Sequence, residues 1–181
     1  MYDLKIYSVS DRYISFLSKY ASGVYSNKEG LRSHTRKYVG VVYFINGYNY
    51  YIPLSSAKNS DYKIIKNQKV IRRSIVPIMR IVLKEPNGEL ELKGTLRISH
   101  MIPVPSSELG LYDLDNETDL SYKDLVQKEI VFIRKNKIKI ESNAELMYKQ
   151  KVTNDTTANY ITTALDYRLL ESKCNEFIKI E

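Results

Sequence analysis

The chain has 181 residues and a formal net charge of +7, from 28 lysine and arginine residues against 21 aspartate and glutamate residues. Hydrophobic residues make up 43% and charged residues 27%, which is ordinary for a soluble globular protein and argues against disorder. A single cysteine cannot form an internal disulfide, and one cysteine with only two histidines in the whole chain argues against a structural zinc site. No apolar run is long enough for a membrane helix. We therefore expect one cytoplasmic domain over residues 1–181, with no secretory signal and no metal or other cofactor.

The first half of the sequence predicts one helix and several strands. Residues 4–9 form a short strand, and Ser10 is placed to cap an amphipathic helix over residues 11–20. A polar loop follows over 21–35, and Asn-Gly pairs then indicate two hairpins. The hairpin strands are 38–45 with 48–54, joined by Asn46-Gly47, and 75–85 with 89–98, joined by Asn87-Gly88. Residues 55–68 between the hairpins are predicted to be a polar, basic loop.

The second half predicts an extended segment over 102–105, a strand over 109–114 and an acidic loop over 115–120. Capping-box patterns and apolar spacing then predict three helices. These helices cover residues 121–136, 142–151 and 156–178. Because strands come first and helices last, we predict the α+β class, with a twisted, part-closed antiparallel sheet and helices packed over it.

The positive charge is concentrated in one segment. Residues 31–80 hold ten basic residues and one acidic residue, a net charge of +9, whereas residues 81–121 have a net charge of −5. Six of the 16 tyrosines lie in the basic segment, and aromatic faces among cations suit the unpaired bases of single-stranded nucleic acid. The alternative is a solvated, lysine-rich surface. The residues that we expect to contact RNA are Arg32, His34, Lys37, Tyr62, Lys63, Lys66 and Lys69.

The sequence lacks the motifs of several common enzyme classes. The chain has no glycine-rich phosphate loop, no dinucleotide fingerprint and no Gly-x-Ser-x-Gly nucleophile elbow. Acidic residues over 113–124 are spaced like a calcium loop, but Thr118 and Asp124 stand where glycine and glutamate are expected. The same acids could bind magnesium for two-metal hydrolysis, although they lie in the segment poorest in basic residues. A magnesium-dependent nuclease and a simple acidic surface loop both stay open as alternatives.

The polar end of the first hairpin gathers cations and hydroxyl groups. With a two-residue turn, Arg36 and Lys37 face the positions that directly follow the second strand. They therefore lie beside a cluster made of Ser55, Ser56 and Lys58. Metal-free RNA cleavage needs such groups, because the RNA 2′-hydroxyl is itself the nucleophile and the protein must move protons and neutralise a phosphorane. The alternative is a turn in which the serines cap a short helical turn and the cations are solvated.

The cleavage hypothesis gives each of these residues a role. Ser56 hydrogen-bonds the scissile phosphate or orients the 2′-hydroxyl. Lys58 acts as an acid–base group or as the cation that stabilises the transition state, and Arg36 holds phosphate. His34 and His100 are candidates for an acid–base pair, with structural roles as the alternative.

Six stretches match one known family in that family's own order. They are 8–17 (SVSDRYISFL), 36–42 (RKYVGVV), 50–58 (YYIPLSSAK), 100–103 (HMIP), 112–114 (YDL) and 121–136 (SYKDLVQKEIVFIRKN). In these stretches the chain resembles the ToxN/AbiQ (CptN-like) endoribonuclease toxins of bacterial type III toxin–antitoxin and phage abortive-infection systems. Each piece alone is weak, but the set is fairly specific.

The resemblance implies a ToxN-like fold with a MazF/Kid-like core, in which helices ring a highly twisted antiparallel sheet. It implies metal-independent cleavage of cellular mRNA, which we expect at adenine-rich sites, to a 2′,3′-cyclic phosphate and a 5′-hydroxyl. It also implies processing of, and inhibition by, a small repeated pseudoknot RNA antitoxin in a closed protein–RNA assembly, with no membrane or DNA partner. The family's active-site positions fall on Tyr13, which positions RNA or joins proton transfer, and on Arg36, Ser55, Ser56 and Lys58.

Two positions depart from the family's pattern. Family members often have a proline where this chain has Ala57 and a histidine where it has Asp61. An acid–base role of that histidine must be absent or moved, and His34 is a candidate for it. Rival hypotheses are a non-catalytic single-stranded RNA-binding module, which does not need Ser56, and a DNA-binding regulator, for which no recognition helix is evident.

Overall fold

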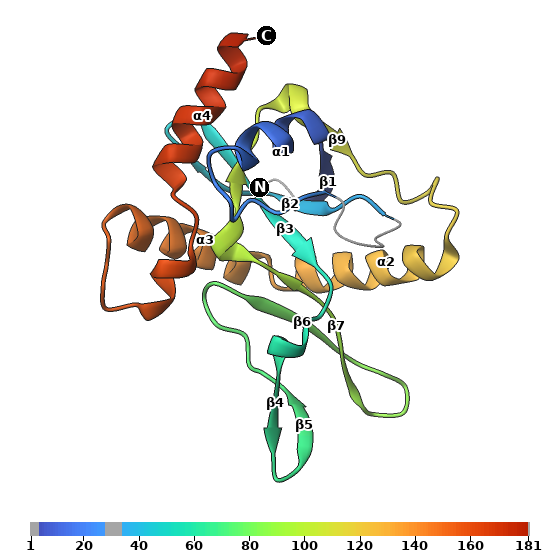
Figure 1. Cartoon of the computed structure of the whole chain (residues 1–181). Coiled ribbons are helices and arrows are strands. Elements are labelled where there is room, and N and C mark those ends of the chain that lie inside the picture. Colours follow the sequence, from blue (N-terminus) through green and yellow to red (C-terminus); the bar gives the residue numbers. More distant parts are fainter. Residues whose placement is uncertain (1–3, 28–33, 181) are drawn as a thin grey trace.

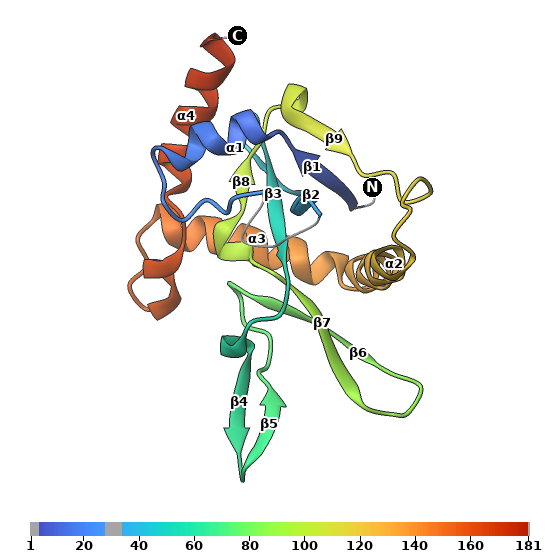
Figure 2. The ribbon, with the colours of Figure 1, turned by 45° about the vertical axis from the view of Figure 1, so that its right-hand side comes forward.

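A computed structural model describes residues 4–27 and 34–180, and it is built around an antiparallel sheet (Figures 1 and 2). The strands of this sheet are β1 (Lys5–Val9), β2 (Lys37–Ile45), β3 (Tyr48–Ser55), β6 (Met79–Lys84), β7 (Leu90–Leu96), β8 (Ile102–Pro103) and β9 (Leu109–Leu111). Their order is β6–β7–β3–β2–β1–β9, and β8 pairs with β3. The predicted α+β class with an antiparallel sheet is confirmed.

Four helices and several single turns pack around this sheet in the described ranges. The helices are α1 (Asp11–Ser18), α2 (Leu120–Lys135), α3 (Lys137–Val152) and α4 (Tyr167–Ile180), and the 3₁₀ turns are η1 (Asn59–Asp61), η2 (Ile98–His100), η3 (Ser106–Glu108) and η4 (Asn159–Thr163). In Figure 1, α2 and α3 follow one another below β1, β2 and β3 and above the β6–β7 hairpin, and α1 lies beside α4 in the upper part of the view. Within the described ranges, none of the helices combines the length and apolar character that a bilayer-spanning helix needs.

The first two helices begin at polar caps. Ser10 caps α1 as predicted, because its Oγ accepts a hydrogen bond from the Tyr13 N–H at 3.2 Å. At α2 the cap is Asp119, whose Oδ1 accepts from the Tyr122 N–H at 3.0 Å. The helix therefore begins at Leu120, one residue before the predicted start.

The starts of the other two helices were predicted wrongly. α3 begins at Lys137, well before the predicted start, because Asn136 closes the last turn of α2 with its N–H and the first turn of α3 with its C=O. The capping-box pattern that suggested a later start lies inside the helix. α4 begins at Tyr167 rather than at 156, because Asp166 accepts the N–H of Leu169 and residues before it form turns.

The β2–β3 hairpin has the predicted Asn46-Gly47 turn but only part of the predicted register. Near the turn the strands pair as expected, and an irregularity between Val39 and Tyr43 then moves the pairing by two positions. Tyr38 consequently lies opposite Pro53. The irregularity therefore places the residues before β2 beside positions of β3 that are two residues earlier in the chain than predicted.

The second predicted hairpin is present as β6 and β7. The turn is longer than the predicted Asn87-Gly88 pair, because the Gly88 N–H donates to the Glu85 carbonyl at 2.8 Å. Gly88 has φ +87°, whereas Asn87 does not share the positive φ that a type I′ turn needs at both positions. β6 begins only at Met79, because Pro77 has no N–H to donate to a sheet and residues 75–78 form a single bridge.

A third hairpin falls where a loop was predicted, so that part of the prediction is wrong. Its strands are β4 (Tyr62–Ile65) and β5 (Gln68–Ile71), and it projects from the body of the molecule (Figures 1 and 2). Lys66 and Asn67 join the strands with φ +47° and +64°, the conformations of a type I′ turn. Because this turn has no glycine, the sequence carried no Asn-Gly signal for it.

Tyrosine rings form much of the core beside the sheet. The hydroxyl groups of Tyr50 and Tyr148 each donate to Oε1 of Glu171 at 2.8 Å. Tyr51 is buried against Gly40, where a Cβ would lie 2.1 Å from the ring, so only glycine fits at that position. These buried rings stabilise the fold and are closed to a nucleic-acid ligand.

Glu129 is a buried carboxyl group between α2 and β7. Its Oε1 lies 2.8 Å from the place that a Cβ on Gly94 would occupy, so the carboxyl group packs directly against the backbone of β7. The side chain is 8% exposed, and burial raises the pKa of Glu129 to about 7 from an ordinary value of 4.5.

We expect Glu129 to make folding depend on pH. The folded protein keeps this proton up to about pH 7, whereas the unfolded chain releases it near pH 4.5, so the free energy of unfolding falls as pH rises between these values. Glu129→Gln should lose this pH dependence and be more stable than the wild type above pH 7, by on the order of 2–3 kcal/mol. Urea unfolding at about pH 5 and about pH 8 measures the effect, and equal pH dependence in both proteins would contradict it.

Candidate active site

Arg36 ties the segment before β2 to the end of β3. Its Nε donates to the Ser26 carbonyl at 2.9 Å, and its Nη1 donates to the Leu54 carbonyl at 2.9 Å and reaches Oγ of Ser55 at 3.5 Å. The Arg36 backbone N–H donates to the carbonyl of Asn27 at 3.0 Å. Since Arg36 is 1% exposed, these contacts form a buried base beneath the polar end of the hairpin.

Tyr25 lies at the centre of a group of cations and rings. The Cζ atom of Arg36 is 4.8 Å from the centre of the Tyr25 ring, and Nζ of Lys58 is 5.5 Å from it. The ring of His100 stacks on Tyr25, with 4.7 Å between ring centres and planes 4° apart. Sequence analysis missed Tyr25, because it lies in the segment predicted as a polar loop.

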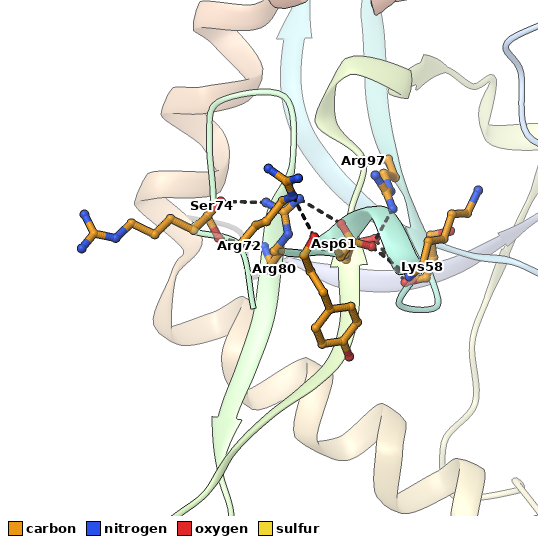
Figure 3. A network of polar contacts seen from close by, with 10 residues as sticks. Lys58, Asp61, Arg72, Ser74, Arg80 and Arg97 are labelled. Carbon is orange, nitrogen blue, oxygen red and sulfur yellow. Dashed lines mark hydrogen bonds and ion pairs between the residues drawn. The ribbon is translucent and has the colours of Figure 1, made fainter. Parts of the chain in front are cut away.

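Lys58 is held by the turn that follows it. Its backbone N–H donates to Oδ2 of Asp61 at 2.9 Å, and the Asp61 N–H donates to the Lys58 carbonyl at 2.9 Å. The Asp61 side chain also meets two arginines, with its Oδ1 3.0 Å from Nη2 of Arg80 and its Oδ2 3.0 Å from Nη2 of Arg97 (Figure 3). Asp61 is 0% exposed, so a fully buried carboxylate fixes the backbone of the candidate catalytic lysine.

The same residues anchor the base of the β4–β5 hairpin. The N–H of Arg72 donates to the backbone carbonyl of Asp61 at 2.8 Å, and Nη1 of Arg80 donates to the carbonyl of Arg73 at 2.7 Å. The backbone N–H of Arg80 donates to Oγ of Ser74 at 2.8 Å (Figure 3). The turn at Lys58 and the root of the hairpin thus share one network.

Among the residues of this cluster, positive charges outnumber negative charges. Arg36, Arg80 and Arg97 are all buried. The carboxylate of Asp61 forms ion pairs with Arg80 and Arg97. Burial, together with the charges of Arg97, Lys58 and Arg36, lowers the pKa of His100 to about 4. His100 is therefore neutral near pH 7, and its Nδ1 lies 2.9 Å from Oγ of Ser99. The positive charges of Lys58, Arg36, Arg80 and Arg97 favour an anion such as a phosphodiester in this region.

Solvent reaches only some of these groups. Ser56 and Lys58 are exposed and Tyr25 is half-buried, whereas Arg36 and Ser55 lie behind them. An RNA phosphate on this surface would meet a hydroxyl, an ammonium group and an aromatic face, with buried positive charge beneath. The structure therefore brings Ser55, Ser56, Lys58 and Arg36 together, as the sequence analysis expected of their positions.

Two predicted site residues take other places. Arg36 is enclosed by backbone carbonyls, so the prediction that it holds phosphate directly is corrected to a supporting position. Tyr13 lies in the core at 0% exposure, where its hydroxyl donates to the Pro103 carbonyl at 2.7 Å and its ring packs edge-on against Phe177. Burial raises the pKa of Tyr13 far above its ordinary value. Contact of Tyr13 with RNA is therefore not compatible with its position.

Other predicted RNA contacts lie outside this cluster. Nζ of Lys37 is 4.4 Å from the centre of the Tyr112 ring, on the side of the sheet formed by β1 and β9. The ring of His34 stacks on Tyr122 with 3.7 Å between centres, and its Nε2 lies 3.2 Å from Oδ2 of Asp119. The two histidines therefore do not form a pair. Arg32 lies outside the described residues, and the β4–β5 hairpin holds Tyr62, Lys63, Lys66 and Lys69.

Carboxylates of the acidic segment over 113–124 accept hydrogen bonds from nearby backbone N–H groups. Asp113 accepts hydrogen bonds from the backbone N–H groups of Asp115 and Asn116, and Asp119 caps α2. Within residues 4–27 and 34–180, no three histidine, cysteine, aspartate or glutamate side chains lie close enough together to hold a metal ion. In this structure Asp113 therefore stabilises a turn and Asp119 caps a helix.

Comparison with known proteins assigns the chain to a family. The family model described as toxin ToxN of the type III toxin–antitoxin system matches residues 5–175. The chain belongs to the ToxN family. It is 32% identical to the endoribonuclease AbiQ of Lactococcus lactis subsp. lactis over 176 residues, which cover 97% of this chain and 90% of AbiQ. It is 28% identical to the endoribonuclease ToxN of Bacillus thuringiensis subsp. kurstaki over 179 residues, which cover 96% of this chain and 84% of that protein.

Solved structures of ToxN-family proteins share the fold. The structure of AbiQ, described as a lactococcal anti-phage endoribonuclease of the type III toxin–antitoxin system, gives a TM-score of 0.75 at 28% identity and covers 98% of this chain and 99% of that one. A structure from work on selective toxin inhibition by a non-coding RNA pseudoknot gives 0.74 at 28% identity, covering 97% of this chain and 98% of that one.

We expect Asp61→Asn to destabilise this ToxN-family chain. The change leaves Arg80 and Arg97 buried without their carboxylate, and breaking a buried ion pair in this way costs about 3–5 kcal/mol. Asp115→Asn is the matched control, because Asp115 is an exposed carboxylate and its loss should change the free energy of unfolding by under about 0.5 kcal/mol. Urea unfolding measures both variants, and equal stability of the two would show that Asp61 does not hold the network together.

Proposed function

We propose that this chain is a metal-independent endoribonuclease toxin of a type III toxin–antitoxin and abortive-infection system. The main supporting observation is that Nζ of the exposed Lys58 lies 5.5 Å from the centre of the Tyr25 ring, which also contacts the buried Arg36, and that Ser56 is exposed two residues before Lys58. The relatives AbiQ and ToxN, whose alignments cover nearly the whole chain, are named endoribonucleases. A site of hydroxyl groups and cations suits a substrate that supplies its own nucleophile and develops negative charge on phosphorus.

In the proposed reaction the 2′-oxygen of the RNA bonds to the adjacent phosphorus, and the bond from phosphorus to the 5′-oxygen breaks. The 2′-hydroxyl loses its proton, the 5′-oxygen gains one, and the products are a 2′,3′-cyclic phosphate and a 5′-hydroxyl. Lys58 stabilises the phosphorane or takes part in proton transfer, and Ser56 donates to a non-bridging oxygen. Arg36 and Ser55 support these groups from behind by fixing the end of β3.

The proposed substrate is cellular mRNA cut at adenine-rich sites, and the proposed partner is a small, repeated pseudoknot RNA antitoxin. This antitoxin would be cut from a precursor by the protein and would inhibit it in a closed protein–RNA assembly. The +9 charge of residues 31–80 supports a polyanionic partner. His34, Lys37 and Arg32 stay predicted RNA contacts for nucleotides that flank the site.

Three further proposals complete this assignment. Residues 1–181 work as one toxin domain in the cytoplasm. The sheet is the highly twisted, part-closed core of the MazF/Kid type that the sequence resemblance implied. β3 pairs with β2, with β7 at its last two residues, and with β8, which lies off the main strand order, and this change of partner along one strand supports a strongly curved sheet.

We expect Lys58→Ala and Ser56→Ala each to abolish toxicity, because each removes a group that contacts the reacting phosphate. Expression in bacteria at matched protein levels, with colony counts as readout, measures this. Lys179→Ala is the control, since Lys179 is an exposed lysine in the last turn of α4. Wild-type toxicity in both site variants would remove this site from the proposal.

We expect the purified protein to cleave an adenine-rich RNA in excess EDTA and to leave a 2′,3′-cyclic phosphate, because the site supplies its positive charge from lysine and arginine. Mass spectrometry of the 5′ fragment identifies the terminus. Loss of cleavage in EDTA, restored by magnesium, would favour a two-metal nuclease. Binding without cleavage in either condition would favour a non-catalytic RNA-binding module.

A further inference from the structure

The β4–β5 hairpin has properties that its role in the fold does not explain. Residues 62–73, which we call the arm, leave the body of the molecule in both views (Figures 1 and 2). At the arm Ile64 is 68% exposed, Ile65 43% and Val70 37%. An isolated two-stranded hairpin is marginally stable in water, so these exposed aliphatic side chains point to a ligand that covers them.

The charge of the arm identifies the chemistry of that ligand. Five of its twelve residues are basic and none is acidic. The basic residues are Lys63, Lys66, Lys69, Arg72 and Arg73. A concentration of positive charge on a projecting ribbon fits the phosphate backbone of a nucleic acid better than it fits an apolar protein surface.

The strand register places a cation and apolar groups on each face of the arm. Residues directly opposite one another share a face, so Lys69 lies with Tyr62 and Ile64. Nζ of Lys69 is 4.1 Å from the centre of the Tyr62 ring. The other face carries Lys63 with Val70. Each face can therefore hold phosphate with its lysine and pack apolar side chains against sugars or bases.

The root of the arm is fixed to the candidate active site. Asp61 accepts the N–H of Arg72 with its backbone carbonyl and the N–H of Lys58 with its carboxylate. Four strand residues from Tyr62 to Ile65 extend about 13 Å at 3.3 Å per residue. An RNA bound to the arm is therefore held in a fixed orientation to the cleavage site, and the arm contacts nucleotides outside the cleaved segment.

We propose that the arm is a docking element for folded RNA, which it holds by the phosphate backbone beside the cleavage site. This inference rests on the proposed function only in taking RNA as the ligand. A short single strand fills the surface at Ser56 and Lys58 without reaching the arm, whereas a strand joined to a folded stem reaches both. The arm thereby distinguishes a structured inhibitor or precursor RNA from a simple unstructured substrate.

The test compares two RNA probes on the intact protein. One probe is an adenine-rich strand carrying 2′-O-methyl groups, which block the nucleophile, and the other is the same strand extended by a stem-loop. The arm variant is Lys63→Gln/Lys66→Gln/Lys69→Gln, and the control variant is Lys5→Gln/Lys19→Gln/Lys179→Gln, which removes the same charge from other exposed positions. Equilibrium binding is measured over a range of salt concentrations.

The arm variant should bind the stem-loop probe at least about tenfold more weakly than the wild type. The slope of its log affinity against log salt concentration should be shallower by about 2–3, because three phosphate contacts are lost. Binding of the short probe, and cleavage of its unmodified form, should stay within about twofold of wild type, and the control should resemble wild type for both probes. Equal losses on both probes, equal losses in the control, or no loss at all would each overturn the docking role. A wild-type protein that cleaves no RNA would contradict the proposed function while leaving this binding comparison readable.

Discussion

The fold and the candidate site both depend on the buried carboxylate of Asp61. It meets the guanidinium groups of Arg80 and Arg97, holds the backbone of Lys58 with a side-chain oxygen, and anchors Arg72 through its carbonyl. Buried guanidinium groups are tolerated only when a charge and hydrogen bonds compensate for their lost hydration. One residue therefore permits positive charge to be buried beneath the site, sets the position of the exposed lysine, and joins the arm to it.

Asp61 stands where the sequence resemblance led us to expect a histidine. In the structure its carboxylate pairs with Arg80 and Arg97 in a buried network. His100 does not replace that histidine as a cation, since burial and nearby cations keep it neutral, but its ring supports Tyr25 from one side. Ser56 and Lys58 are the exposed members of the predicted catalytic set, and the proposed chemistry rests on them.

Sequence patterns predicted the parts of the fold that local rules determine. The Asn-Gly turns located two hairpins, and Ser10 located the first helix. The irregularity between Val39 and Tyr43 in β2 could not be predicted from alternation alone, so the predicted register was two positions off at Arg36. Polar residues of Ser55–Lys58 indicated the site, but Tyr25 belongs to it only through packing on His100 and Arg36. The burial of Tyr13 likewise depends on α4, which is distant in sequence.

A structure of the protein with an adenine-rich RNA that carries a 2′-O-methyl group at the cleaved nucleotide tests the central claim most directly. The account predicts that the scissile phosphate lies within hydrogen-bonding distance of Nζ of Lys58 and Oγ of Ser56, with a sugar or base against the Tyr25 ring and Arg36 still bonded to the end of β3. RNA bound on another face, with Lys58 and Ser56 left in solvent, would contradict it.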